Sequence, residues 1–437
     1  MSAADLVTLA SCDLAGITRG RSVFADQLEQ YLRTGVGWTP ANQALTPLGP
    51  VAEDDPFGAT GDLRLLPDPD TRMRISADAH AGPLELLLCD IVETDGAPWR
   101  CCTRTLLRDA LATLERETGL TLWASFEHEF QLSSGEPPAL PFSVETQRRA
   151  EPFATDVMRA LLEAGAEPER FFPEYAPHQF EIPVAQAPGM VAADRAVIFK
   201  EVVRELARRN GARASFSPLL DPEQAGNGVH IHLRLLDGAG AAAMYDPQRD
   251  GCVSAIGGSF AAGILRHARA LCALTAPSPV SASRLQPHRW GAGAVALANR
   301  NREALLRIPP LVTLGGGDPA AQMRLEYRGA DGAANPYLAL AAIVLAGLDG
   351  LAAGLPTPPI LEQDPASLDQ ASAERFGVGG LPGSLAEALA ALADDDVARA
   401  WLDPQLYAAH VSIKRSEIEA SARLDPEEVC RRYGAIY

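Results

Sequence analysis

The chain has 437 residues, of which 47% are hydrophobic and 22% charged, a composition typical of a folded protein with more than one core. Its net charge of −18 argues against nucleic acid or an anionic membrane as partner, because both attract basic surfaces. Seven irregularly spaced cysteines favour reduced thiols and a cytoplasmic location. The first residues lack the features of a signal peptide, and the most apolar stretch, 338–348, is too short to cross a membrane.

Short apolar runs broken by Gly, Pro and Asp fill the first hundred residues, and this pattern predicts a small β-rich unit. A helix with leucines on one face opens at Thr103 and ends at Gly119. We therefore expect an N-terminal domain at residues 1–100 and a second domain at 101–437.

Strand-like and helical segments alternate in the second domain, without an internal repeat. Hydrophobic spacing and capping signals predict strands at 121–132, 229–235 and 323–328, and helices at 199–209, from Asn335, and from Ser384.

Each of the three predicted strands carries polar residues at positions i and i+2. Such residues point to the same face of a strand, so Glu127 with Glu129, and His230 with His232, would each line one cavity. Each pattern alone also fits an ordinary solvated strand or a chance pair. A buried carboxylate pair, however, is costly unless cations neutralise it. Together the strands predict a pocket with oxygen ligands for divalent cations and arginines for phosphates.

The order of these motifs resembles the glutamine synthetase family from about residue 10 to the C terminus. The N-terminal segments 13–21 and 61–68 are similar to that family's two amino-terminal signatures. The matching catalytic motifs are the E-x-E-F strand at 126–130, the E…Q-x-E segment at 174–181, the G-S-G-M-H-x-H loop at 226–232 with Asn227 in place of Ser, and the arginine blocks at 301–309 and 324–338.

The resemblance implies ATP as co-substrate, two or more Mg²⁺ or Mn²⁺ ions in each active site, and roles for individual residues. By motif, Glu129, Glu174 and Glu181 would hold one ion; Glu127, His230 and Glu326 would hold the other; Glu169 and His232 would contact ATP; Arg302, Arg307 and Arg324 would bind ATP and neutralise the transferring phosphate; and Gly226, Arg284 and Arg328 would bind glutamate.

The resemblance also implies an α+β fold: a small N-terminal β-grasp-like domain and a catalytic domain with a curved antiparallel sheet. Family members form ring-like homo-oligomers, in which a neighbour's N-terminal domain completes each active site. In the implied reaction, the γ-carboxylate of glutamate attacks the γ-phosphate of ATP, and an amine then displaces phosphate from γ-glutamyl phosphate. Metal and arginine charges would stabilise the transferring group.

Three departures from the family pattern concern the amine. The loop that is acidic in ammonia-using members has no acid at 35–43, the flap glutamate is replaced by Trp290, and a usual lysine is Leu219. Capturing ammonium favours fixed carboxylates, whereas an indole packs on a carbon skeleton. We therefore predict a γ-glutamyl-amine ligase with Trp290 in its amine pocket. A monoamine is favoured, because no acid is evident at the far end of that pocket.

Two alternatives remain open. If Trp290 is a core or interface aromatic, the protein is a true glutamine synthetase that uses ammonia. A non-catalytic sensor would bind ATP without turnover, but it has no reason to keep six costly metal ligands and five arginines. The sequence leaves open the amine, the ring size, and whether another acid replaces glutamate.

Overall fold

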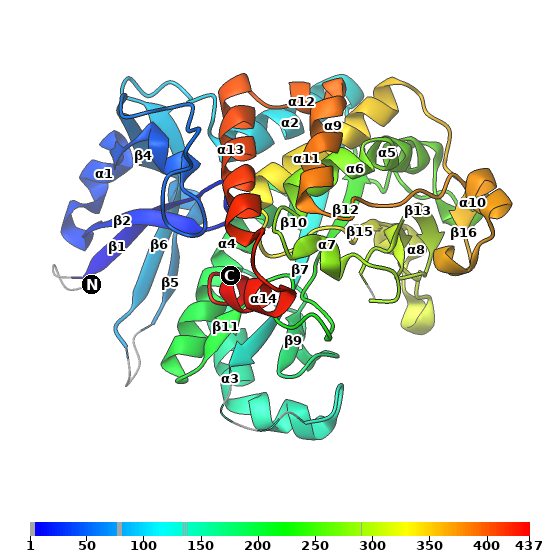
Figure 1. Cartoon of the computed structure of the whole chain (residues 1–437), viewed down its shortest axis with the longest axis horizontal. Coiled ribbons are helices and arrows are strands. Elements are labelled where there is room, and N and C mark those ends of the chain that lie inside the picture. The colour runs from blue at the N-terminus through cyan, green and yellow to red at the C-terminus, as the bar shows by residue number, and fades with distance from the viewer. Residues whose placement is uncertain (1–4, 77–80, 134, 136, 138, 290) are drawn as a thin grey trace.

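The computed structural model describes residues 5–76, 81–133, 135, 137, 139–289 and 291–437. Within these ranges the chain forms two sheets with helices packed around them, which confirms the predicted α+β class. Figure 1 shows the smaller sheet at the left of the molecule and the larger one at its centre. All seven cysteines are described and carry free thiols.

The N-terminal sheet has the strand order β2-β1-β6-β4-β3, with β5 also paired to β6. Its pairings are antiparallel except between β1 and β6, which run parallel. Its elements are β1 (Leu6–Cys12), β2 (Thr18–Phe24), α1 (Leu28–Thr34), β3 (Val36–Trp38), β4 (Leu63–Pro67), β5 (Met73–Ile75) and β6 (Leu84–Glu93).

The larger sheet has the order β16-β13-β14-β15-β12-β7-β9-β8, and β10 and β11 also pair with β7. Its pairings are antiparallel except at one edge, where β13 runs parallel to both β14 and β16. Its strands are β7 (Thr121–Ser133), β8 (Phe172–Pro173), β9 (Gln179–Ile182), β10 (Ala187–Pro188), β11 (Arg213–Ser215), β12 (Val229–Leu236), β13 (Ala294–Asn299), β14 (Ala304–Ile308), β15 (Leu325–Tyr327) and β16 (Ile360–Leu361).

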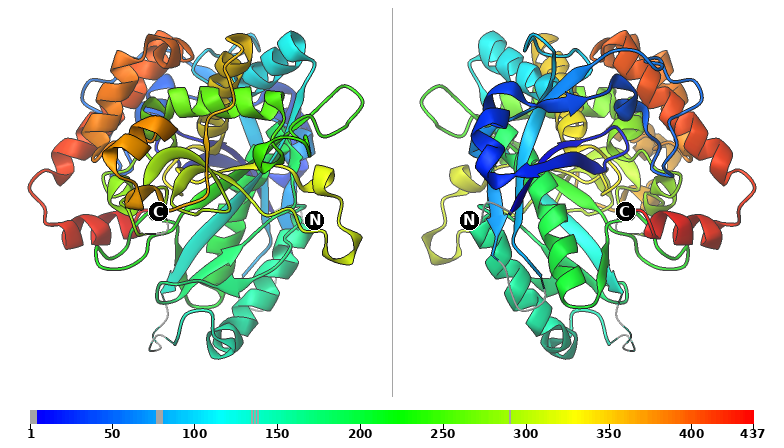
Figure 2. Two further views of the ribbon diagram at one scale, coloured as in Figure 1. Left: turned by 90° about the vertical axis from the view of Figure 1, so that its right-hand side faces the viewer. Right: turned by 90° about the vertical axis from the view of Figure 1, so that its left-hand side faces the viewer.

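Most helices gather in the upper half of the molecule, whereas α3 lies at its lower end (Figure 2). The helices beyond α1 are α2 (Thr103–Thr118), α3 (Val144–Glu163), α4 (Gly189–Arg209), α5 (Ala255–Arg266), α6 (Ala268–Thr275), α7 (Ser281–Arg284), α8 (Pro319–Gln322), α9 (Pro336–Ala352), α10 (Gln370–Phe376), α11 (Leu385–Asp394), α12 (Asp396–Ala400), α13 (Pro404–Ser421) and α14 (Pro426–Gly434).

Helix α9 is apolar on nearly every face because other elements surround it. Asn335 caps its N terminus by accepting a hydrogen bond from the Leu338 amide at 3.0 Å. Among the described residues, no helix is both long enough and apolar enough to cross a membrane.

Helix α4 begins ten residues before the predicted start at Phe199. Residues 189–198 are mostly apolar, and the one acid among them, Asp194, is buried. Asp194 accepts two hydrogen bonds from Arg104 at 2.9 Å, and Arg104 also pairs with Asp68 and Asp90. This network ties helices α2 and α4 to strands of the N-terminal sheet.

A second set of hydrogen bonds joins the loop between β1 and β2 to the loop that follows β15. The buried Lys200 ammonium donates to the carbonyl oxygens of Gly16 at 3.0 Å and Gly332 at 3.2 Å. Gly16 has φ +73°, and a Cβ there would lie 2.4 Å from the Ala333 carbonyl oxygen. Only glycine permits this close approach.

Candidate active site

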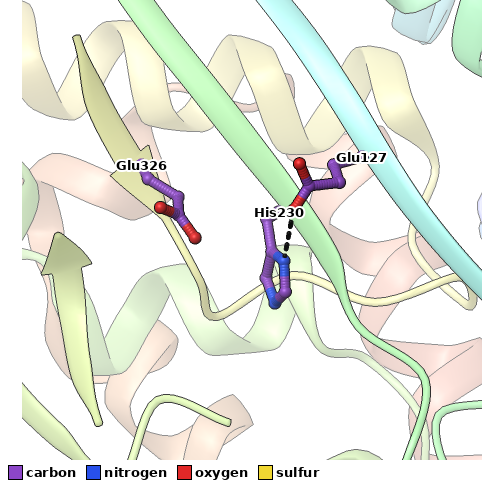
Figure 3. Close-up of side chains that lie close together, drawn as sticks. All are labelled: Glu127, His230 and Glu326. Atoms are coloured by element: carbon purple, nitrogen blue, oxygen red, sulfur yellow. Dashed lines mark hydrogen bonds and ion pairs between the residues drawn. The ribbon is translucent and has the colours of Figure 1, made fainter. Parts of the chain in front are cut away.

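Strand register brings the predicted metal ligands together on the large sheet. His230 of β12 lies opposite Glu127 of β7, and its Nδ1 is 3.1 Å from Glu127 Oε1. Glu326 of the neighbouring strand β15 completes a group whose ligand atoms lie within 4.8 Å of one another. Figure 3 shows the three side chains converging from three strands.

A second group shares the same histidine. Glu129 of β7 lies opposite Glu181 of β9, and both carboxylates lie within 4.8 Å of the His230 ring. Glu129 Oε2 also accepts hydrogen bonds from the Gly228 amide at 2.9 Å and from Gln179 Nε2 at 3.1 Å. Among the described residues, neither close group contains Glu174, although its charge acts on the others.

The pKa values of Glu181 and Glu174 are raised, whereas that of Glu326 is lowered. Burial and the neighbouring charges of Glu127, Glu129 and Glu174 raise the pKa of Glu181 well above its usual value. Burial and Glu129 also raise the pKa of Glu174, to about 7. Burial opposes ionisation of Glu326 as well, but Arg328 and the neighbouring histidines lower its pKa to about 2.

This donor set fits a pair of divalent cations. Four carboxylates and an imidazole converge in a partly buried site, where burial and the charges of neighbouring carboxylates disfavour ionisation of Glu181. Positive charge bound between them would offset those charges, and oxygen donors with one nitrogen suit Mg²⁺ or Mn²⁺.

Arginines flank the acidic groups. Arg307 of β14 donates to Glu326 Oε2 at 2.6 Å, and Arg328 is bonded to the other oxygen of the same carboxylate. Arg328 also donates through Nε to the Arg302 carbonyl oxygen at 3.0 Å. The Arg302 side chain is exposed, beside a cavity of about 540 Å³ whose other lining residues include three acids, Glu303, Glu362 and Asp364.

The predicted nucleotide contacts lie beside the metal ligands. Arg324 Nε donates to His232 Nδ1 at 3.2 Å, so the proton of the neutral imidazole belongs on Nε2, which lies 3.4 Å from Glu127 Oε2. Glu169 is half exposed, and its charge acts on the Arg324 guanidinium.

Arg284, predicted to bind glutamate, is buried against the glycine loop at 226–228. A Cβ at Gly226 would lie 2.8 Å from Arg284 Cγ, and one at Gly228 would lie 3.1 Å from its Nη1. The glycines of this loop therefore leave the space that the guanidinium occupies.

The amine site is only partly described. Trp290, the predicted amine-pocket residue, lies outside the described residues. Leu219, which we predicted to replace a lysine of the family, is buried in a small apolar cluster with Val280 and Tyr433.

The sequence motifs assigned no role to Gln179. Its Nε2 donates to Glu129, to the Gly226 carbonyl oxygen at 2.9 Å and to Asn227 Oδ1 at 3.0 Å. This one amide therefore joins the metal ligands to the glycine loop. The Q-x-E spacing was visible in the sequence, but the partners of the glutamine were not.

Comparison with known proteins shows the family of this chain. The model of the glutamine synthetase catalytic domain matches residues 100–432, and that of the glutamine synthetase N-terminal domain matches residues 1–99. The gamma-glutamylpolyamine synthetase GlnA3 of Streptomyces coelicolor is 37% identical, covering 98% of this chain and 92% of the relative.

More distant relatives include a glutamine synthetase of Thermus thermophilus, 33% identical over 82% of this chain and 81% of the relative. Among solved structures, one described as a novel glutamine synthase homolog superimposes with a TM-score of 0.92. It is 43% identical and covers 100% of this chain and 99% of its own.

Proposed function

The chain belongs to the glutamine synthetase family of ligases, and we propose that it joins the γ-carboxylate of L-glutamate to an organic amine with ATP as co-substrate. The observation that carries this proposal is the Glu127–His230–Glu326 group with Arg307 and Arg328 bonded to the same Glu326. Side chains that can bind cations and side chains that can donate to phosphate thus lie side by side on the large sheet.

In this proposal, Glu127, His230 and Glu326 would hold one divalent cation, while Glu129 and Glu181, with Glu174 nearby, would hold the other. Such cations, when bound, supply positive charge beside the ATP phosphates and the attacking carboxylate. Arg302, Arg307 and Arg324 bind the transferring phosphoryl group and stabilise its charge. His232 and Glu169 contact the nucleotide.

Arg284, Arg328 and the backbone at Gly226 bind the acid substrate. They hold the γ-carboxylate in line for attack on the γ-phosphate, so that proximity supplies much of the rate. The amine then displaces phosphate from γ-glutamyl phosphate, and no protein side chain acts as nucleophile.

The choice of an organic amine rests on residue types near the expected amine site. Trp290 stands where ammonia-using members have a glutamate, and segment 35–43 has no acid. The Streptomyces coelicolor relative is named for polyamines, and three acids line the cavity beside Arg302. The predicted preference for a monoamine therefore has to be tested directly against diamines and polyamines.

We further propose a division into an N-terminal domain at 1–100 and a catalytic domain at 101–437, a cytoplasmic location, and a ring-like homo-oligomer. In such a ring, a neighbouring copy would bring its N-terminal domain to the amine side of each site. Light scattering of the purified chain tests the oligomer.

The deciding experiment measures phosphate release from ATP with Mg²⁺ and glutamate. Ammonium is compared with small alkyl amines, hydroxyalkyl amines, aromatic amines, diamines and polyamines. We expect turnover with an organic amine to exceed that with ammonium. The reverse order would make the protein a true glutamine synthetase, and ATP binding without any turnover would make it a sensor.

A substitution sharpens the assignment of the amine pocket. Trp290→Glu should lower kcat/KM for the preferred amine and raise it for ammonium, since a carboxylate favours a small cation. Trp290→Phe is the matched control, because it keeps an aromatic ring. If both variants and the wild type had the same specificity for the preferred amine over ammonium, Trp290 would not belong to the amine pocket.

A further inference from the structure

Gln179 is a buried side chain between the metal ligands and the glycine loop at 226–228. It is 2% exposed, and its Oε1 accepts a hydrogen bond from the Ala176 amide at 2.8 Å. This contact fixes the orientation of the amide group, because only the oxygen can accept from a backbone N–H. The nitrogen Nε2 therefore faces the site.

Nε2 has more acceptors than protons. It lies 3.1 Å from Glu129 Oε2, 2.9 Å from the Gly226 carbonyl oxygen and 3.0 Å from Asn227 Oδ1. A side-chain amide carries two protons, so it cannot serve three acceptors fully at once. An ionised carboxylate is a stronger acceptor than a neutral carbonyl oxygen. Without a bound cation, Glu129 therefore competes with the glycine loop for the Gln179 amide.

The carbonyl group of Gly226 depends on this amide. Within the described residues, no other hydrogen bond reaches the Gly226 carbonyl oxygen. Asn227 has further anchors: its backbone amide donates to the Pro218 carbonyl oxygen at 3.0 Å, and its side chain donates to that of Ser217 at 2.9 Å. The Gln179 contact thus sets the position of the backbone at Gly226.

Binding of a cation to Glu129 would end the competition. Glu129 belongs with Glu181 and His230 to one of the two groups that can hold a metal ion. When a cation neutralises this carboxylate, its oxygens become weaker hydrogen-bond acceptors. Both protons of the Gln179 amide then serve the glycine loop, which is held in one position.

We propose that Gln179 is a positioning residue that couples cation binding at Glu129 to binding of the acid substrate at Gly226. The coupling is reciprocal, so an occupied glycine loop also favours the cation. This inference rests on the proposed function, in which the Gly226 backbone binds glutamate. Gln179 does not touch the substrate and acts only through its hydrogen bonds to Glu129 and the loop.

A purely structural role for Gln179 makes a different prediction. Its Oε1 bond to the Ala176 amide shapes the turn after Glu174, and the Glu174 amide donates to the Gln179 carbonyl oxygen at 2.8 Å. If Gln179 only shaped this turn, its substitution would lower stability and leave the coupling between cation and glutamate unchanged.

Gln131 provides a matched control. It lies opposite Gln179 in the pairing of β7 with β9, is 7% exposed, and donates through Nε2 to the Pro177 carbonyl oxygen at 3.0 Å. It therefore supports the same turn with a buried amide. Among the described residues, its side chain has no hydrogen bond to a metal ligand.

The test titrates Mn²⁺ into the full-length chain, without and with saturating L-glutamate, and measures free Mn²⁺ by electron paramagnetic resonance. The ratio of the two dissociation constants is the coupling factor. In wild type we expect glutamate to tighten Mn²⁺ binding about tenfold or more. Gln179→Met should reduce the coupling factor at least about fivefold, whereas Gln131→Met should leave it within about twofold of wild type.

Two features of the chain bear on the size of this effect. The Gly228 amide donates directly to Glu129 Oε2 at 2.9 Å, so part of the coupling remains in every variant. Gln179→Glu keeps the acceptor for the Ala176 amide and lacks the amide protons, so it preserves the turn. The coupling factor should fall in this variant as well, even if Gln179→Met folds poorly.

Three results would overturn the inference: a wild-type coupling factor in Gln179→Glu or Gln179→Met, an equal loss in Gln131→Met, or no effect of glutamate on Mn²⁺ binding in wild type. Phosphate release by wild type separates this inference from the proposed function. Turnover without coupling that depends on Gln179 overturns the inference alone. Coupling that depends on Gln179, without turnover of any amine or ammonium, overturns the proposed function alone.

Discussion

Neutralising Glu174 should stabilise the metal-free protein while weakening its response to metal. The pKa of this half-buried carboxyl group is about 7, against an ordinary value of 4.5, because of burial and the charge on Glu129. Each pKa unit corresponds to about 1.4 kcal/mol, so ionising Glu174 costs the folded state at most about 3 kcal/mol. Solvent screening of a half-buried group reduces this to about 1–2 kcal/mol.

The sign of the pH dependence follows from the raised pKa. Below pH 4.5, Glu174 is protonated in both the folded and the unfolded protein and destabilises neither. As the pH rises from 4.5 through about 7, the unfolded chain gains charge at no cost, and the folded protein loses stability. In EDTA, Glu174→Gln should therefore melt at the same temperature as wild type at pH 4.5 and a few degrees higher at pH 8.

Thermal melts in EDTA, repeated with Mg²⁺ and with Mn²⁺, measure both effects. Added metal should stabilise wild type more than the variant, because stabilisation by a ligand grows with its affinity for the folded state. Glu419→Gln, at an exposed position on α13, is the matched control and should follow wild type throughout. A Glu174→Gln protein that melts below wild type at pH 8 in EDTA would refute this reasoning.

Further substitutions test the network around the site. Glu326→Gln should abolish turnover and lower the free energy of unfolding by about 3 kcal/mol, measured by urea denaturation, because it leaves two bonded arginines without their anion. Arg104→Met should cost about 3–5 kcal/mol in the same assay, because it removes the buried cation that three aspartates share between the N-terminal sheet and the helices. Gly332→Ala should lower the melting temperature, since its Cβ would lie 2.3 Å from the Phe216 carbonyl oxygen. Unchanged stability in any of these variants would contradict the ion pair or close approach on which its prediction rests.

Local patterns predicted three of the strands that carry the site, but not β9 with Glu181 or β14 with Arg307. Alternation placed Glu127 and Glu129 on one face of a strand, and the structure has that strand at Thr121–Ser133. Asn335 predicted the start of α9, and the family models confirm the family that the motif order indicated. These features follow from residues close together in the sequence, where side-chain direction and capping depend on local geometry.

The tertiary structure decided which of these residues meet. Alternation cannot show that His230 lies near both carboxylate groups, or that Glu174 belongs to neither of them. Those relations depend on the register between strands far apart in sequence and on the burial of charges against one another. Both arise only when the whole chain packs, because residue type and spacing set the direction of a side chain but not its distance to a distant partner.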